Sequence, residues 1–475
     1  MQTSKRAPHG RRAGLFISLI SIFLAFTCLF IYTWQRVYNP SPVPVSQAEA
    51  DLSRTVYFTS LSPVNGARSF SDAPDLFSFQ AMPEGSAFSG FINARSAILA
   101  DASTGSVLFE KNADEIIPPA SMTKLVAMYT AFHAAENGEI TFDDVVALPK
   151  ETWAVNIPSG SSLMFLAEGQ KVTVRELLSG MAVASGNDAA LALALHVSPA
   201  LDVFIARMNG EMERLGLPNT RFVEPSGLSG ENKTTSREFA DFSLRYIREY
   251  PEALRAFHAQ TTIEYPMPWN TPGRTDTRAV VQSATNKLLG VLEGCDGLKT
   301  GYINESGYNI SLTCERNGTR YIAVTMGGPG SGSYEGNLLR SEDGTALMEW
   351  AFANFRTVKS EEIKPFPMTV WGGTDDSMDA IPAGMASFTA PVSVELTDGK
   401  GSGMKTEIFL PSRIWAPVAA GTVVGRVDYT AGGKALHSVP LIAGRSIARG
   451  NALHVLIDTA ASLVSPLAGN KSRYR

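Results

Sequence analysis

The spacing of apolar residues changes along this chain from a strand pattern to a helical pattern and back, which limits the folds it can adopt. Residues 97–109 predict a β-hairpin whose turn contains Ser103-Thr104-Gly105, and residues 308–326 predict a second hairpin across Asn317-Gly318. Residues 119–215 between them carry several stretches with helical spacing. A sheet that draws its strands from both ends of this region, with helices between them in sequence, predicts an α+β domain.

The predicted helix boundaries in this region lie next to polar residues. One helix follows Pro118-Pro119 and ends before Gly138. A second helix opens at Thr173, where Glu176 three residues later completes the sequence pattern of a capping box. Ser185-Gly186-Asn187 interrupts the helical pattern that follows, so we expect these three residues at a helix break.

The N-terminal residues 13–34 are almost wholly apolar and long enough to cross a bilayer as a helix, which takes about 20 residues. Basic residues precede this segment and only Arg36 closely follows it, which places residues 1–12 in the cytoplasm and the remainder outside. A cleaved signal peptide would have a shorter apolar core with a small-residue cleavage site close behind it. We therefore expect an uncleaved transmembrane anchor, followed by a flexible linker over residues 35–90.

Strand patterns dominate the chain beyond a boundary near residues 360–367. Apolar and polar residues alternate over 392–396, and a further apolar run covers 423–429. These patterns predict a small all-β domain over residues 362–448, after an α+β domain over residues 91–358.

The C-terminal residues 451–467 place apolar side chains on one helical face, which predicts an amphipathic helix. A membrane surface, a partner protein and a neighbouring domain are all candidate contacts for that face. The basic residues Lys471, Arg473 and Arg475 follow and favour anionic lipid.

The cysteines are too few to form a disulfide scaffold, so the fold must rest on its own core. Cys28 lies in the apolar N-terminal segment, whereas Cys295 and Cys314 lie in the exported part, where a disulfide is permitted. If Gly301 pairs with Tyr308 in an antiparallel hairpin, the same register sets Cys295 opposite Cys314. A disulfide and a pair of buried free thiols both fit this register.

The tetrapeptide Ser121-Met122-Thr123-Lys124 places a hydroxyl and an amine three residues apart at a predicted helix start. Positions three apart share one face of a helix, so the two groups lie close together. A serine hydroxyl needs a base to act as a nucleophile, and a nearby amine can serve if burial lowers its pKa. Taken alone, the tetrapeptide is more often a capping serine and a surface lysine.

Two further polar triplets follow it along the chain. Ser185-Gly186-Asn187 offers a hydroxyl and an amide at the helix break. Lys299-Thr300-Gly301 offers an amine and a hydroxyl at a strand end, where glycine lets a ligand approach the backbone. Each triplet alone is common, but three polar sets at element ends, in this order, are what a serine acyl-transfer site requires.

These motifs closely resemble those of the low-molecular-mass penicillin-binding proteins that are D-alanyl-D-alanine carboxypeptidases. The resemblance extends over about residues 91–448 and includes the surroundings of each motif: Ile92-Asn93-Ala94-Arg95-Ser96, Pro119-Ala120 before the nucleophile, Asp188-Ala189-Ala190, Asp296-Gly297-Leu298, Tyr302 and Trp415-Ala416-Pro417-Val418. It implies a penicillin-binding/β-lactamase-like transpeptidase domain, with an antiparallel sheet and helices, followed by a small all-β domain. The chain departs from the family at Ile303, where members often carry threonine.

The resemblance implies catalytic roles for three side chains. Ser121 is acylated by the substrate, Lys124 takes its proton, and Ser185 relays a proton toward the leaving amine. Water then hydrolyses the acyl-enzyme, and β-lactams mimic the substrate and acylate the same serine. No metal or organic cofactor is needed.

The resemblance also implies a substrate-binding set. Asn187 holds the peptide amide, and Lys299-Thr300-Gly301 forms the strand end at which the lysine and the threonine bind the terminal carboxylate. Backbone N–H groups of Ser121 and Tyr302 form the oxyanion hole. The expected substrate is a peptidoglycan stem pentapeptide, and the expected location is the periplasmic side of the bacterial inner membrane.

Other classes of function share parts of this pattern. A β-lactamase shares the three motifs, and Glu224-Pro225 is similar to its catalytic loop, but residue 228 is leucine where that loop requires asparagine. A non-enzymatic wall-binding protein would not need all the motif residues intact. A D,D-endopeptidase is a nearer alternative, although the C-terminal β-domain favours a carboxypeptidase. Nucleic-acid binding is not expected, because the net charge is −5.

Overall fold

The computed structural model describes residues 87–358, 364–383, 387–393, 404–411, 413–431 and 434–464. The expected cytoplasmic segment, the expected transmembrane anchor at 13–34 and nearly all of the expected linker lie outside the described residues. Within the described ranges, no single helix is long and apolar enough to cross a bilayer; only α5 (Asn187–Val197) and α6 (Leu201–Arg214) taken together, with a 91° bend between them, reach that length and composition.

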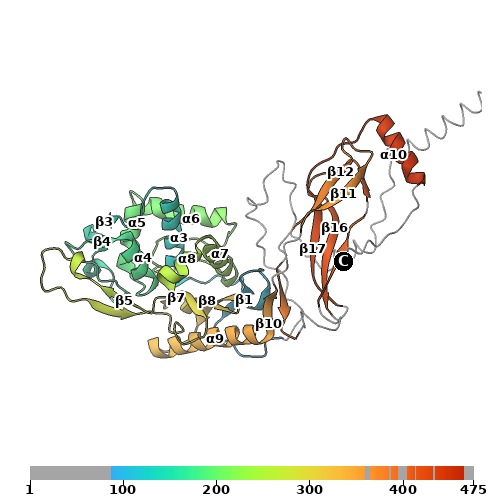
Figure 1. The fold of residues 1–475 in the computed structure, drawn as a ribbon. Coiled ribbons are helices and arrows are strands. Elements are labelled where there is room, and N and C mark those ends of the chain that lie inside the picture. Colours follow the sequence, from blue (N-terminus) through green and yellow to red (C-terminus); the bar gives the residue numbers. More distant parts are fainter. Residues whose placement is uncertain are drawn as a thin grey trace, which may run out of the picture. The chain divides into compact units, whose positions relative to one another are not determined.

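A five-stranded antiparallel sheet forms the centre of the first domain, in the order β2-β1-β9-β8-β7 (Figure 1). Its strands are β1 (Ser96–Asp101), β2 (Val107–Lys111), β7 (Cys295–Ile303), β8 (Gly307–Arg316) and β9 (Thr319–Gly328). Both predicted hairpins are confirmed, and β1 pairs with β9, so the early and late strands share one sheet. Asn317 and Gly318 both have positive φ, which a two-residue turn of this kind requires.

Side chains point alternately to the two faces of this sheet, and both faces are buried. Ile98 and Ala100 of β1 pack into the larger core with the helices of the first domain, whereas Ala97 and Leu99 pack on the other side with α9 (Ser333–Asn354). Figure 1 shows α9 along one face and the helical cluster on the other. The α+β prediction is therefore confirmed.

Helices lie within residues 119–215, where helical spacing predicts them, and further helices of the first domain follow that region. They are α3 (Thr123–Glu136), α4 (Val174–Ala182), α5 (Asn187–Val197), α6 (Leu201–Arg214), α7 (Ser236–Glu249), α8 (Pro251–Ala253) and α9 (Ser333–Asn354), with short 3-10 turns at Ala120–Met122, Lys150–Thr152, Ala154–Asn156 and Pro268–Asn270 and a π-turn at Leu254–His258. Two small pairs of strands join them: β3 (Val145–Val146) with β4 (Val172–Thr173), and β5 (Thr262–Tyr265) with β6 (Val280–Ser283).

The capping box predicted at the start of α4 is present. The Thr173 hydroxyl accepts the N–H of Glu176 at 3.2 Å, and the Glu176 carboxylate accepts the N–H of Thr173 at 2.8 Å. Two otherwise unpaired donors are thereby satisfied, which fixes where α4 begins. The predicted break also occurs, because α4 ends at Ala182 and α5 begins at Asn187.

The second domain is built on a six-stranded sheet in the order β14-β16-β17-β12-β11-β15. Its strands are β11 (Phe366–Trp371), β12 (Ser377–Pro382), β14 (Lys405–Phe409), β15 (Arg413–Trp415), β16 (Val423–Ala431) and β17 (Lys434–Ala443), while β10 (Phe355–Val358) pairs separately with β13 (Phe388–Pro391). The run at 423–429 forms the predicted strand. The strand expected at 392–396 is not seen at its start, since Val392 lies in a turn after β13; Val394 and Leu396 lie outside the described residues.

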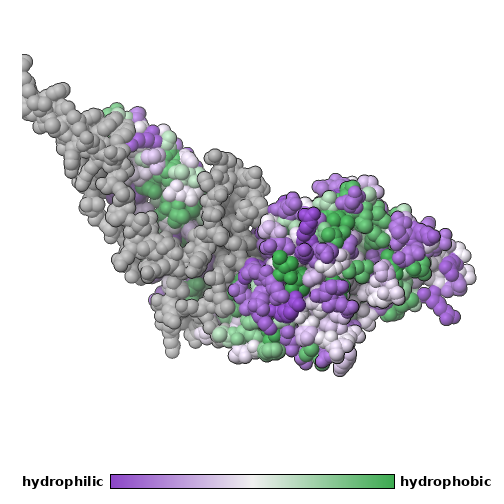
Figure 2. All heavy atoms as spheres, turned by 180° about the vertical axis from the view of Figure 1, so that it is seen from behind, coloured by the Kyte–Doolittle hydropathy of each residue, from purple (hydrophilic) through white to green (hydrophobic). Residues whose placement is uncertain are grey.

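The predicted C-terminal helix is α10 (Ala452–Val464). It contacts the β-domain through Asp458, whose carboxylate accepts the N–H of Gly372 at 2.6 Å, and through His454, which lies 3.0 Å from Asp376. Leu453 and Ile457 are nonetheless 66% and 57% exposed, so part of the apolar face stays uncovered by the described residues. In Figure 2, polar and apolar residues are interspersed over the visible face of the first domain.

Cys295 and Cys314 lie opposite each other on neighbouring strands, but the strand register that places them there differs from the predicted one. Gly301 pairs with Asn309 and not with Tyr308, so the assumed register is wrong by one residue at that end. An irregularity between Cys295 and Gly297 shifts the register back and sets Cys295 directly opposite Cys314. Both cysteines are present as free thiols, Cys314 buried and Cys295 half-buried.

We predict that Cys295 and Cys314 form a disulfide in protein isolated from an oxidising compartment, because directly opposed residues on antiparallel strands are close enough to bridge. Thiol labelling of denatured, unreduced protein followed by mass spectrometry checks this. Labelling of neither cysteine before reduction and of both afterwards is expected. Labelling of both before reduction would show that the pair stays reduced.

Candidate active site

Ser121 lies in the short 3-10 turn Ala120–Met122 that leads directly into α3. Its neighbours Ala120 and Met122 are fully buried, whereas Ser121 remains partly accessible. Lys124, one turn further on, is fully buried, and its Nζ lies 3.0 Å from Ser121 Oγ. The predicted contact between hydroxyl and amine is therefore present in the folded chain.

The Lys124 amine has two further partners from distant parts of the chain. Its Nζ donates to Asn187 Oδ1 at 2.6 Å and to the Ser226 carbonyl at 2.5 Å. Burial lowers the pKa of Lys124 from 10.5 to about 7, while the negative charges of Glu224 and Asp188 act in the opposite direction. A substantial fraction of this amine is thus neutral near pH 7.

Lys299 approaches the site from strand β7. Its Nζ donates to Ser185 Oγ at 2.9 Å and to the Thr300 carbonyl at 3.1 Å. Burial lowers the pKa of Lys299 well below its usual range, and the positive charges of Lys124 and Arg340 lower it further. Two buried amines, Lys124 and Lys299, therefore flank the serines of the site.

Strand β7 comes close to Ser121 because residue 301 is glycine. A Cβ at Gly301 would lie 2.5 Å from the carbonyl oxygen of Pro119 and 3.1 Å from the backbone nitrogen of Ser121. The Gly301 carbonyl accepts a hydrogen bond from the buried guanidinium of Arg340. The Tyr302 side chain is partly exposed and packs on Tyr308, with ring centroids 4.3 Å apart.

The structure thus brings together Ser121, Lys124, Ser185, Asn187, Lys299 and the backbone around Gly301. Thr300 contacts the site from its edge, where its hydroxyl donates to Thr285 at 2.8 Å. The Tyr302 hydroxyl instead donates to Asn304.

Four residues next to this set were not singled out as site residues in the sequence. Arg340 reaches β7 from α9, and Thr285 contacts Thr300 from the chain before β7. Asp188 accepts three backbone N–H groups, those of Met164, Leu166 and Ala189. Of these contacts only Asp188 had a sequence signal, as the residue directly after Asn187.

The fourth is Glu224, which begins a loop that packs against the turn carrying Ser121. Its Oε2 accepts the N–H and the hydroxyl of Ser226 at 2.8 and 2.5 Å. Its Oε1 accepts the N–H of Gly227 at 2.7 Å and an N–H of Asn232 at 2.8 Å. Both carboxylate oxygens are therefore occupied by the loop itself.

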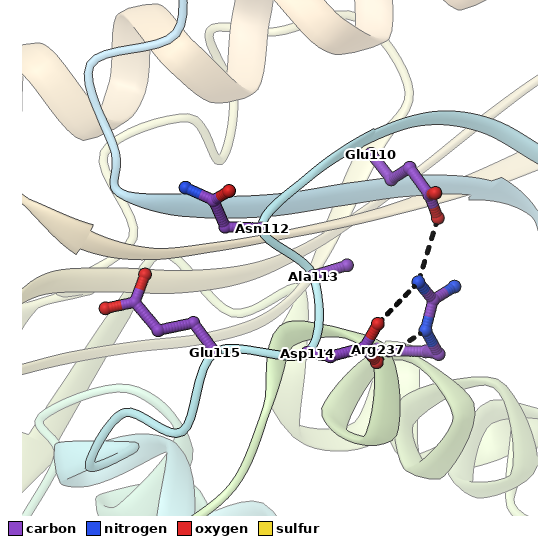
Figure 3. Close-up of a pocket in the computed structure, with 6 residues that line it drawn as sticks. All are labelled: Glu110, Asn112, Ala113, Asp114, Glu115 and Arg237. Atoms are coloured by element: carbon purple, nitrogen blue, oxygen red, sulfur yellow. Dashed lines mark hydrogen bonds and ion pairs between the residues drawn. The ribbon is translucent and has the colours of Figure 1, made fainter.

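An open surface pocket lies elsewhere, between the end of β2 and the start of α7 (Figure 3). Arg237 lies across it, 2.8 Å from Asp114 and 2.9 Å from Glu110. Glu110 and Asp114 both pair with Arg237, Glu115 pairs with Arg95, and the pocket contains none of the motif residues. In the part of the chain that the structure describes, no cluster of three or more His, Cys, Asp or Glu side chains is arranged to hold a metal ion.

Comparison with known proteins connects this geometry to a family. The D-alanyl-D-alanine carboxypeptidase family matches residues 83–330, and the C-terminal domain of penicillin-binding protein 5 matches residues 361–449. The D-alanyl-D-alanine carboxypeptidase DacC of Escherichia coli is 33% identical over 367 residues, which is 76% of this chain and 85% of that protein. DacA of Haemophilus influenzae is 31% identical over 395 residues, covering 82% of this chain and 93% of that protein.

Solved structures agree with the sequence relatives. Penicillin-binding protein 5 from Haemophilus influenzae superimposes with a TM-score of 0.62 at 30% identity, covering 76% of this chain and 99% of that chain. Penicillin-binding protein 6B from Escherichia coli gives a TM-score of 0.58 at 28% identity, covering 74% and 96%. The match over both domains, joined to the geometry around Ser121, shows that the chain belongs to the D-alanyl-D-alanine carboxypeptidase family of low-molecular-mass penicillin-binding proteins.

Proposed function

We propose that this chain is a serine D-Ala-D-Ala carboxypeptidase that removes the terminal D-alanine from peptidoglycan pentapeptides through an acyl-enzyme on Ser121. The observation that carries the proposal is the 3.0 Å contact between Ser121 Oγ and the buried amine of Lys124. β-Lactams, which mimic D-Ala-D-Ala, acylate the same hydroxyl.

Lys124 serves as the base because of how its hydrogen bonds are distributed. A neutral amine has two N–H groups and one lone pair. The Asn187 side chain and the Ser226 carbonyl accept the two N–H groups, which leaves the lone pair for the Ser121 hydroxyl. A pKa of about 7 matches the requirement that a general base be poised near the working pH.

Ser185 and the strand end at 299–301 complete the reaction. Ser185 is held by Lys299 and relays a proton to the leaving amine of D-alanine. Lys299 and Thr300 bind the carboxylate of that residue, and Asn187 holds the peptide amide. The N–H groups of Ser121 and Tyr302 stabilise the oxyanion, and water then releases the shortened peptide.

The chain is organised to hold this enzyme outside the cytoplasm. We assign residues 1–12 to the cytoplasm, 13–34 to a single-pass anchor in the bacterial inner membrane and 35–90 to a linker. The catalytic domain at 91–358 and the β-domain at 362–448 then lie in the periplasm. The apolar run at 13–34 and its basic flank support this arrangement.

The two alternative enzyme functions are less well supported. A β-lactamase needs a carboxylate free to activate water, whereas both oxygens of Glu224 are occupied by its own loop. A D-alanyl-D-alanine endopeptidase of Pseudomonas aeruginosa is 27% identical over 258 residues, or 54% of this chain. The carboxypeptidase relatives align over a longer stretch, so carboxypeptidase activity is the stronger proposal.

Ser121→Ala should abolish both D-alanine release from pentapeptide muropeptides and labelling by a fluorescent penicillin, because no acyl-enzyme can form. The wild-type protein should release D-alanine faster than it cleaves cross-linked muropeptides in the same assay. Ser159→Ala, at an exposed serine, is the matched control and should behave as wild type. Covalent labelling that persists in Ser121→Ala would assign the nucleophile to another residue.

Lys299→Ala should lower the acylation rate constant by about ten- to a hundredfold, since the charged carboxylate of the substrate loses a buried hydrogen-bond donor. Stopped-flow acylation with a chromogenic cephalosporin measures this, and thermal unfolding checks that the fold is intact. Lys150→Ala removes an exposed lysine and should leave acylation unchanged. An unchanged rate constant in Lys299→Ala would exclude Lys299 from the site.

The exposed apolar residues of α10 should bind lipid, as a second membrane contact besides the anchor. Protein comprising residues 37–475 should float with anionic liposomes, and replacing Leu453, Leu456 and Ile457 by serine should reduce flotation to the level of protein ending at Ala448. If all three proteins float equally poorly, α10 packs only on the protein and the N-terminal segment is the sole anchor.

A further inference from the structure

The loop that begins at Glu224 presents a single peptide group between two charged side chains. The carbonyl of Ser226 accepts a hydrogen bond from Lys124 Nζ at 2.5 Å. The N–H of Gly227, in the same peptide group, donates to Glu224 Oε1 at 2.7 Å. One end of this peptide thus contacts the buried lysine and the other end contacts a carboxylate.

The planarity of the peptide bond makes these two contacts interdependent. In a trans peptide the C=O and the N–H are coplanar and point in opposite directions. A carboxylate that fixes the Gly227 N–H therefore also fixes the direction in which the Ser226 carbonyl points. The remaining bonds of Glu224, to the N–H and hydroxyl of Ser226 and to Asn232, prevent the loop from turning about that contact.

The same loop is packed tightly against the nucleophile. Gly227 has φ +86°, and a Cβ there would lie 1.9 Å from the Ala120 carbonyl oxygen and 2.7 Å from the Ser121 nitrogen. Asn232, which holds Glu224, also donates to Thr123 at 3.2 Å. A shift of the loop would therefore also displace the turn that carries Ser121.

We propose that Glu224 is a positioning residue of the acylation step: by holding the peptide between Ser226 and Gly227, it aims the Ser226 carbonyl at Lys124 and so directs the lysine lone pair toward Ser121. This inference rests on the proposed function, in which Lys124 deprotonates Ser121. Without the Ser226 carbonyl as acceptor, one N–H of Lys124 loses its partner, and the amine is free to rotate its lone pair away from the serine.

Glu224 also acts on the amine through its charge. The carboxylate favours the protonated form of Lys124 and partly offsets the effect of burial on the pKa. Removal of this charge must lower the pKa of Lys124. Since acylation requires the neutral amine, the acidic limb of the acylation profile must then move to lower pH. A substitution that only loosened the loop and kept the charge would leave that limb in place.

The test is the pH dependence of single-turnover acylation by a chromogenic cephalosporin, with deacylation followed separately. Wild type should show an acidic limb near pH 7. Glu224→Gln should shift the limb to lower pH by on the order of one unit and lower the plateau rate constant about tenfold. Glu224→Asp keeps the charge but is one methylene shorter, so the limb should stay in place while the plateau falls.

The matched control is Glu231→Gln, which removes the same charge from an exposed position on the same loop and should change neither quantity. An unmoved limb in Glu224→Gln, or a selective loss of deacylation with acylation intact, would overturn the proposal. If Glu224→Gln does not fold, an unchanged plateau in Glu224→Asp would overturn it. Absence of acylation in wild type would instead refute the proposed function, so the two failures are distinguishable.

Discussion

Burial of the Lys124 amine is the constraint on which the rest of the catalytic domain depends. Placing an ammonium group in the core costs several kcal/mol, and the group responds by releasing its proton more readily than in water. A neutral buried amine still needs acceptors for its N–H groups, because an unpaired donor would be costly. Those acceptors come from α5 and from the loop after Glu224, so both must converge on the start of α3.

This convergence explains why the domain is built on a sheet that is covered on both faces. Strand β7 presents Lys299 to Ser185, and α9 supports β7 from behind through Arg340. The helices on the opposite face hold Lys124 and Asn187 at the depth where water is excluded. Strand β7 needs a buried support on one face of the sheet, and the Lys124 amine needs a buried environment on the other. A sheet with one face exposed could not provide both.

Much of this arrangement follows from the sequence. Periodicity predicts the two hairpins and the helices between them, and the capping box fixes the start of α4. The three motifs predict that Ser121, Lys124, Ser185, Asn187 and Lys299 meet. The residues that were missed act through contacts that leave no local pattern: Arg340 lies within a regular helix, and Glu224 was weighed only as a possible β-lactamase residue. The register error at Gly301 has a similar origin, because a strand irregularity near Cys295 depends on packing and not on local sequence.

The two glycines that touch the turn of Ser121 also bear on how this enzyme can change under antibiotic selection. Neither Gly227 nor Gly301 has room for even one methyl group, because it would meet backbone atoms at residues 119–121. Resistance by slower acylation therefore cannot evolve in small steps at these two positions, where the smallest substitution displaces Ser121 itself. We expect adaptive changes to accumulate instead among side chains further out, such as Tyr302, where partial exposure leaves space for a range of residues.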